Sequence, residues 1–177
     1  AEMKLQPRWS NRFAPCENRQ KEESRLSTRA IAYLRRQKVP FDVVKYTHQE
    51  KGAAFAAKAV GFPLEATVKT LVADLGHGGH VLALVPGDRQ LDLKKLARAC
   101  GVKRAVMADA AAAERLTGYL VGGISPFATK QRISAVMEER LLAADRVLIN
   151  AGQRGTMLKM APADIADALK APVAAIV

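Results

Sequence analysis

The chain has 177 residues and a mass of 19.1 kDa, which suits one domain with a tail better than two full-sized domains and a linker. It holds 28 Lys and Arg against 17 Asp and Glu, a net charge of +11, so nucleic acid is the leading candidate partner and a merely solubilising basic surface is the alternative. Hydrophobic residues at 49% and charged residues at 25% exclude a wholly disordered or collagen-like chain.

The sequence also indicates a cellular setting. No apolar run approaches the roughly 18 residues that a membrane helix needs, and residues 1–20 lack the apolar core of a secretory signal. Cys16 and Cys100 lie far apart, with no neighbouring Cys or His at metal-ligand spacing. These features predict a cytoplasmic protein with reduced thiols and no membrane contact.

The first 26 residues are expected to form a basic, irregular extension, because no helical or strand period persists there. Residues 1–29 carry seven basic and four acidic side chains, which leaves a net charge of +8 for residues 30–177. The basic character therefore belongs mainly to the folded domain, which we expect over 27–177.

Capping and turn-forming residues divide the rest of the chain into short elements. Helices are predicted over 28–39, 53–60, 93–99, 110–116 and 162–169, and strands over 41–46, 68–74, 80–85, 103–107, 132–137, 146–150 and 156–160. Residues 118–124 read as a Gly-rich strand or loop. Because Gly-rich hairpins recur between the helices, the pattern favours an α+β fold with a mixed sheet over a parallel doubly wound sheet.

Lys69 is the first residue that stands out chemically. Period-two alternation places it on the same strand face as the apolar residues Leu71 and Ala73. One interpretation is that its long side chain extends past the end of the strand into water. The other is that it sets a cation at the mouth of a pocket, where it would hold a phosphate or a carboxylate.

A second feature is a loop in which two adjacent glycines are followed by Ile124, Ser125 and Pro126. The glycines leave main-chain N–H groups unobstructed, so the loop can present amides to an anion or to a developing oxyanion. Its spacing differs from that of phosphate-binding loops and dinucleotide fingerprints, and a plain turn is the alternative.

Four other features have plainer alternatives. A turn between two glycines is expected to expose Arg154, and Tyr46 ends a predicted strand, where it either stacks on a nucleobase or packs half-buried. His77 and His80 lack a third ligand, so no metal site is predicted. Cys100 sits at a helix C-terminus, which disfavours a thiolate, and the sequence offers no recognisable catalytic triad.

Taken together, these residues resemble the YbaK/EbsC family of prolyl-tRNA-synthetase-associated editing domains, from about Ser27 onward. The matching segments are, in order, Tyr46, 68–71, 87–97, 107–109, 117–126 and 152–155, and the stretch over 118–126 is highly specific. The resemblance implies a compact α+β domain around a mixed, partly barrel-like sheet, with helices packed around it.

The resemblance also implies an activity, that of an aminoacyl-tRNA deacylase, which hydrolyses the ester joining a wrong amino acid to tRNA. The family works without a metal or other cofactor and uses the terminal ribose hydroxyl to help activate water. Lys69 would hold the phosphate of the terminal adenosine or the tRNA 3′ end, and the loop over 122–126 would contact the aminoacyl group. The implied catalytic residues are Lys69, Gly122 and Gly123, and the implied substrate-binding residues are Tyr46, Thr70, Ser125, Pro126, Arg154 and Met157.

One departure from the family pattern concerns the amino acid that is removed. Where the cysteine-specific branch carries an acidic residue, this chain has Met157, which cannot accept a charged hydrogen bond. The expected substrate is a mischarged tRNA(Pro) carrying Cys, Ala, Ser or Thr, with prolyl-tRNA synthetase as a further partner. The alternatives are a catalytically silent module that binds tRNA or a synthetase, and the editing domain of a larger prolyl-tRNA synthetase.

Overall fold

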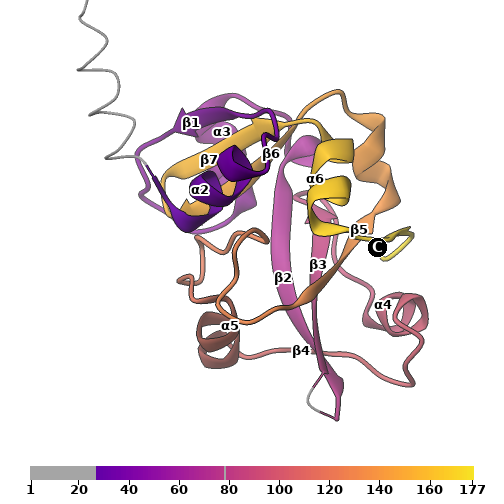
Figure 1. Ribbon diagram of the computed structural model, residues 1–177. Helices are drawn as coiled ribbons and strands as arrows, with labels where there is room; N and C mark the ends of the chain where they lie inside the picture. Colours follow the sequence, from indigo (N-terminus) through magenta and orange to yellow (C-terminus); the bar gives the residue numbers. More distant parts are fainter. Residues whose placement is uncertain (1–26, 78) are drawn as a thin grey trace, which may run out of the picture.

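The computed structural model describes residues 27–177 except residue 78, and in it helices surround two β-sheets (Figure 1). The expected extension over 1–26 lies outside the described residues. The smaller sheet has the order β1-β7-β6, and the larger has the order β4-β2-β3-β5-β8. The strands are β1 (Asp42–Lys45), β2 (Val68–Gly76), β3 (Gly79–Pro86), β4 (Val106–Met107), β5 (Ser134–Glu138), β6 (Val147–Gln153), β7 (Thr156–Met160) and β8 (Val173–Ala174).

Both sheets depend on pairings between distant parts of the chain. In the smaller sheet all neighbours are antiparallel, and β1 pairs with β7. In the larger sheet β2 and β3 form an antiparallel hairpin, whereas β5 lies parallel to β3 and β8 lies parallel to β5. A parallel bridge between Thr67 and Leu148 joins the two sheets, but the described strands do not close into a barrel. The α+β class and the mixed sheet are confirmed.

Most of the helices begin where a capping side chain was expected. They are α2 (Arg29–Arg36), α3 (Ala53–Val60), α4 (Leu93–Ala99), α5 (Ala110–Thr117) and α6 (Pro162–Leu169), with 3-10 turns η1 (Leu64–Ala66) and η2 (Glu139–Ala143). Thr28, Asp92 and Asp109 each accept a hydrogen bond from a first-turn N–H, which confirms three predicted N-caps. None of the helices described over 27–177 is long and apolar enough to cross a membrane.

Some element bounds differ from those expected, and one strand was missed. Helix α2 ends at Arg36 rather than 39, because the chain turns through Lys38 in a left-handed conformation with a φ of 57°. Strand β4 is only two residues long, because it pairs with β2 at Ala73 and Asp74 alone. Strand β8 was not predicted at all, since two residues carry no period of their own.

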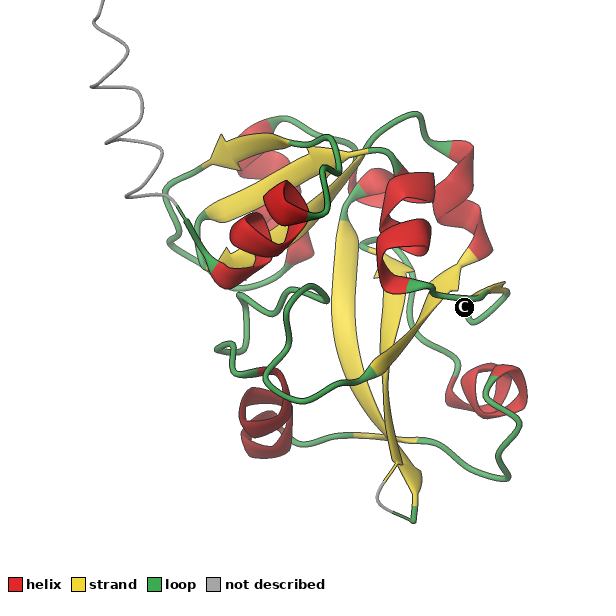
Figure 2. Cartoon of the chain, in the orientation of Figure 1, coloured by secondary structure: helices red, strands yellow, loops and turns green. Residues whose placement is uncertain are grey.

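The core has two main layers that meet at the β2–β3 hairpin, and a smaller third cluster lies between α3 and the smaller sheet. On one face, Val68 and Val72 pack with residues of both sheets and with Ile31 of α2. On the opposite face, Ala73 packs with Leu96 of α4. The smaller sheet lies between α2 and α3, while α4 covers the larger sheet (Figure 2). Strand β2 is therefore buried on both faces, and its residues alternate between the two layers.

Candidate active site

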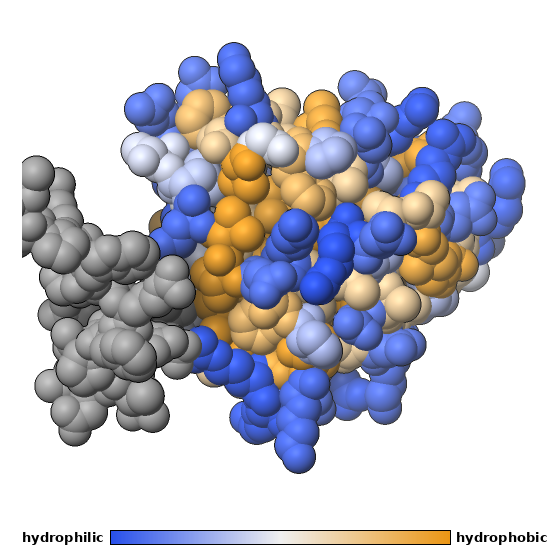
Figure 3. All heavy atoms as spheres, turned by 90° about the horizontal axis from the view of Figure 1, so that it is seen from above, coloured by the Kyte–Doolittle hydropathy of each residue, from blue (hydrophilic) through white to orange (hydrophobic). Residues whose placement is uncertain are grey.

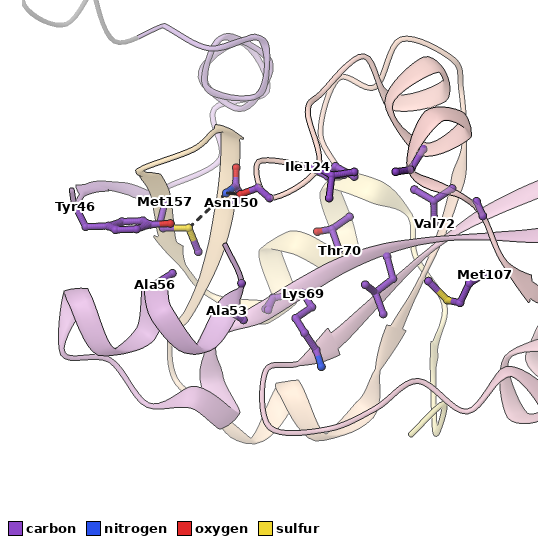
Figure 4. Close-up of a pocket in the computed structure, with 18 residues that line it drawn as sticks. Tyr46, Ala53, Ala56, Lys69, Thr70, Val72, Met107, Ile124, Asn150 and Met157 are labelled. Carbon is purple, nitrogen blue, oxygen red and sulfur yellow. Dashed lines mark hydrogen bonds between the residues drawn. The ribbon is translucent and has the colours of Figure 1, made fainter. Parts of the chain in front are cut away.

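A pocket of about 370 Å³ opens between strand β2, helix α3 and the loop that follows α5 (Figure 4). Figure 4 shows Tyr46, Met157 and Asn150 toward one end and Met107 toward the other. The wall is mainly apolar, and Lys69 is the charged side chain that the described residues contribute to it. Such a pocket suits a small, largely uncharged group that is held next to a single cation.

Lys69 lies at the edge of this pocket, near the start of β2. Its side chain shares a face with Leu71 and Ala73, as expected, and Figure 4 shows its nitrogen pointing away from Thr70. The ammonium group donates a hydrogen bond to the main-chain oxygen of Arg89. Burial lowers the pKa of Lys69, and nearby Asp88 partly offsets this effect. Lys69 is thus a half-buried cation at the edge of the pocket, held by a main-chain oxygen.

Thr70 lies on the opposite face of β2 and lines the pocket. Its hydroxyl is buried and has no hydrogen-bond partner among the described residues. A buried hydroxyl without a partner costs stability, which a bound ligand would restore by forming that hydrogen bond. Thr70 thus offers the pocket a buried hydroxyl that a ligand can engage.

Tyr46, Met157 and Asn150 form the other end of the pocket. Tyr46 is half-buried and packs near Phe55, with ring centroids 6.1 Å apart, and burial raises the pKa of its phenol. Met157 is 3% exposed, and its sulfur lies 3.7 Å from Nδ2 of Asn150. A thioether rather than a carboxylate therefore lines the cavity at this end.

The two glycines of the loop have different surroundings. Gly122 lines the pocket and has a φ of 89°, a conformation that side chains disfavour. Gly123 lies behind it, where an added Cβ would come within 3.1 Å of the main-chain nitrogen of Arg154. Its N–H donates to the carbonyl oxygen of Leu120 at 2.9 Å. Only the first glycine is thus placed to offer an amide to a ligand.

Ser125 and Pro126 are buried and do not line the pocket. The Ser125 hydroxyl accepts a hydrogen bond from the N–H of Phe127 at 3.4 Å, which fixes the turn that follows the glycines. In this structure both residues support the loop rather than reach the cavity.

Arg154 was expected to be exposed, but the structure does not bear this out. It is half-buried, and its guanidinium donates two hydrogen bonds to the carbonyl oxygen of Val121, at 3.1 and 2.6 Å. The turn between β6 and β7 is tied in this way to the glycine loop. Arg154 does not line the pocket, so its connection to the pocket is its contact with the loop.

Other chemistry-bearing side chains lie elsewhere. Cys100 caps the end of α4 and packs against the second core layer, and burial raises the pKa of its thiol. Within the described residues, no group of three or more His, Cys, Asp or Glu is arranged to hold a metal ion. The polar groups that the described residues bring to the pocket are a cation, main-chain amides and small polar side chains.

The aminoacyl-tRNA editing domain model matches residues 47–168 of the chain, which contain every feature of this pocket except Tyr46. The chain belongs to this family of editing domains. The match confirms the resemblance to YbaK/EbsC proteins that the sequence motifs indicated.

Two similar proteins are named as aminoacyl-tRNA deacylases. A proposed Cys-tRNA(Pro)/Cys-tRNA(Cys) deacylase, EbsC of Enterococcus faecalis, is 32% identical over 144 residues, covering 80% of the chain and 88% of the relative. The multifunctional Ser/Thr-tRNA deacylase ProXp-y of Escherichia coli K12 is 34% identical over 140 residues, covering 75% and 83%. The two names differ in the amino acid that is removed.

The fold of this editing domain is also similar to a solved structure. A crystal structure of a proposed trans-editing enzyme for prolyl-tRNA synthetase superimposes with a TM-score of 0.72 at 27% identity, covering 93% of this chain and 98% of that one. The similarity extends over both sheets rather than over the hairpin alone.

Some residues of the editing-domain pocket were not predicted from the sequence. Asn150 was placed in a strand without a role, and Ala53 and Ala56 of α3 were assigned only to a helix. The small size of the two alanines keeps the space beside Tyr46 open. A polar residue at the end of an apolar strand was the available signal for Asn150.

Proposed function

We propose that this editing domain hydrolyses the ester between a wrong amino acid and the 3′ end of tRNA, acting as a separate deacylase. The proposal rests on one observation. A single, mainly apolar pocket is lined by Lys69, by Thr70, whose hydroxyl has no hydrogen-bond partner among the described residues, and by Gly122 with its main-chain amide. Such a set can bind and polarise an ester, and an ester is activated enough to need no protein nucleophile.

The proposed reaction uses water as the nucleophile. Lys69 would bind the phosphate of the terminal nucleotide, which places the aminoacyl ester inside the pocket. Water attacks the carbonyl carbon, assisted by the neighbouring ribose hydroxyl, and the carbonyl oxygen becomes an oxyanion next to Gly122. The bond to the ribose oxygen then breaks, and that oxygen takes up a proton. The products are the free amino acid and tRNA with a free 3′ end.

The pocket end near Met157 would select the amino acid. A thioether, a phenol and a carboxamide meet there without a charged group, so the proposed substrates carry small uncharged side chains: Cys, Ala, Ser or Thr on tRNA(Pro). The names of the two relatives include Cys, Ser and Thr, which supports this range of amino acids but does not single out one of them.

The proposed partners are the acceptor end of tRNA and prolyl-tRNA synthetase. The net charge of +8 over residues 30–177 suits contact with phosphates. Hydrophilic side chains surround a central apolar band on the face seen from above (Figure 3). A cytoplasmic location, where translation uses charged tRNA, is part of the same proposal.

The decisive experiment is a panel of tRNA(Pro) charged with Cys, Ala, Ser, Thr or Pro, each incubated with the full chain. We expect hydrolysis well above the buffer rate for at least one of the first four, with Pro-tRNA(Pro) as the correctly charged control. Tight tRNA binding with no cleavage of any ester would overturn the proposal in favour of a silent binding module.

A further inference from the structure

The peptide unit between Val121 and Gly122 is held from its carbonyl side. Its oxygen accepts hydrogen bonds from Nε and Nη2 of Arg154, at 3.1 and 2.6 Å. In a trans peptide the C=O and N–H bonds point in opposite directions. The N–H of Gly122 therefore points away from Arg154, and no group among the described residues accepts it.

The next peptide unit along the loop has no free donor. The N–H of Gly123 donates to the oxygen of Leu120 at 2.9 Å, and the carbonyl oxygen of Gly122 lies 3.4 Å from Nδ2 of Asn150. Of the two glycine amides, that of Gly122 is therefore the one left for a ligand, at a residue that lines the pocket.

The contacts around this segment restrict its movement. The N–H of Val121 donates to Oε1 of Glu114 at 2.8 Å, so α5 holds the residue that precedes the free amide. Behind the loop, an added Cβ on Gly123 would lie 3.3 Å from the carbonyl carbon of Gln153. Segment 121–123 is thus held between α5 and the β6–β7 turn, and Arg154 supplies the side-chain hydrogen bonds from the turn.

A guanidinium suits this contact for two reasons. Its planar fork delivers two donors to one oxygen, which fixes the direction of the C=O bond as well as its position. Its positive charge draws electron density toward that oxygen, which makes the N–H on the other side of the peptide a stronger donor. A lysine at residue 154 would keep the charge but lose the fork.

We infer that Arg154 is a positioning residue, which orients the Val121–Gly122 peptide so that the Gly122 N–H stabilises the oxyanion of ester hydrolysis. The inference rests on the proposed deacylase function. It differs from the expectation that Arg154 binds the substrate, because the guanidinium contacts the loop and does not line the pocket.

Steady-state kinetics of the full chain on its best mischarged tRNA test this role. Removing one oxyanion donor typically costs about 10²-fold or more in kcat, so Arg154→Ala should lower kcat by about that factor while KM changes little. Arg154→Lys should retain part of the rate, and guanidinium ion added at millimolar concentration should restore part of the rate of Arg154→Ala. Arg98→Ala removes one exposed arginine from α4 and serves as the charge-matched control.

The kinetic outcomes separate the two roles of Arg154. A rise in KM with kcat unchanged would overturn the inference, because it would mean that Arg154 binds tRNA. Wild-type kinetics in Arg154→Ala would overturn it as well. Thermal unfolding of each variant shows whether the fold is kept, and Arg154→Lys provides the test if the alanine variant is unfolded.

A measurement on the ligand-free protein keeps this test independent of activity. The residual dipolar coupling of an N–H bond reports its orientation, so the Gly122 coupling should change in Arg154→Ala while those of Gly61 and Gly101 stay constant. An unchanged Gly122 coupling would overturn the inference even if the enzyme is active. If the wild type hydrolyses no mischarged tRNA, the proposed function fails, and the coupling still decides whether Arg154 orients the peptide.

Discussion

The ammonium group of Lys69 donates a hydrogen bond to the main-chain oxygen of Arg89, which ties the edge of the pocket to the loop that follows β3. An ammonium group has three donors, so this contact leaves others for a phosphate. The loop thus fixes where the cation stands without using up its hydrogen-bonding capacity.

Replacing Lys69 should abolish most of the activity while the fold is kept. We expect Lys69→Ala to lower kcat/KM on mischarged tRNA by about 10²-fold or more, because a fixed, half-buried cation is lost. The Lys94→Ala variant, which removes an exposed lysine of α4, should keep the wild-type rate. Wild-type hydrolysis by a folded Lys69→Ala protein would remove Lys69 from the catalytic site.

The pKa of Lys69 sets a pH limit on hydrolysis. Burial lowers this pKa below the ordinary value of 10.5, so the cation loses its proton at a lower pH than an exposed lysine would. After subtraction of the uncatalysed rate, kcat/KM should fall as the pH rises toward 10.5, and Lys69→Arg should not show that fall in its residual activity. An enzymatic rate that holds steady through pH 10.5 would contradict this role.

The same shift affects stability. Between the lowered pKa and 10.5 the unfolded chain binds more protons at residue 69 than the folded chain does, so this group's contribution to the free energy of unfolding rises with pH there. Over that pH range, the free energy of unfolding measured with urea should rise more for the wild type than for Lys69→Met.

Thr70 should show opposite effects on stability and activity. Thr70→Val removes a buried hydroxyl without a partner and should raise the free energy of unfolding by about 1 kcal/mol, since the shape is kept. The same variant should hydrolyse mischarged tRNA more slowly, whereas Thr70→Ser should keep most of the rate. Urea midpoints and initial rates measure the two effects, and a destabilised but fully active Thr70→Val protein would show that the hydroxyl serves the fold.

Glu138 should matter for stability and not for chemistry. Its side chain is buried, and Oε2 accepts hydrogen bonds from the N–H groups of Ile176 and Val177 at 2.6 and 3.1 Å. Glu138→Ala leaves both donors without this partner and should lower the free energy of unfolding by about 3 kcal/mol. Glu139 is exposed, so Glu139→Ala serves as the control and should change the free energy of unfolding little. The fraction of Glu138→Ala protein that remains folded should keep the wild-type kcat.

Local chemistry made much of the fold predictable. Helix α3 lies where its alanines and the glycine after Val60 place it, and the β2–β3 hairpin follows from alternating apolar residues on either side of a Gly-rich turn. Helix-forming residues, turn glycines and alternating apolar residues act on their near neighbours in the chain, so they can be recognised from the sequence alone. The pairing of β1 with β7 and the two-residue strands depend on distant partners, which no local pattern specifies.

The site shows the same division. Lys69 was recognisable as a cation on an apolar strand face, and the paired glycines as a source of main-chain donors. The sequence could not show that Gly123 uses its N–H on Leu120, or that Arg154 turns back onto Val121. The Gly123 hydrogen bond closes a turn within one loop, whereas the Arg154 contact joins two loops that are far apart in the chain.

The pairing of β1 with β7 has a consequence for the order in which the pocket is made. Val44 pairs with Met157, and this pairing sets Tyr46, just after β1, beside a wall that β6 and β7 provide. Because synthesis proceeds from the N-terminus, Lys69 and the β2–β3 hairpin leave the ribosome before Met157 has been added. A nascent chain thus carries Lys69 and the hairpin before it has the residues of β6 and β7 that line the Tyr46 end of the pocket, so the pocket is completed only late in synthesis.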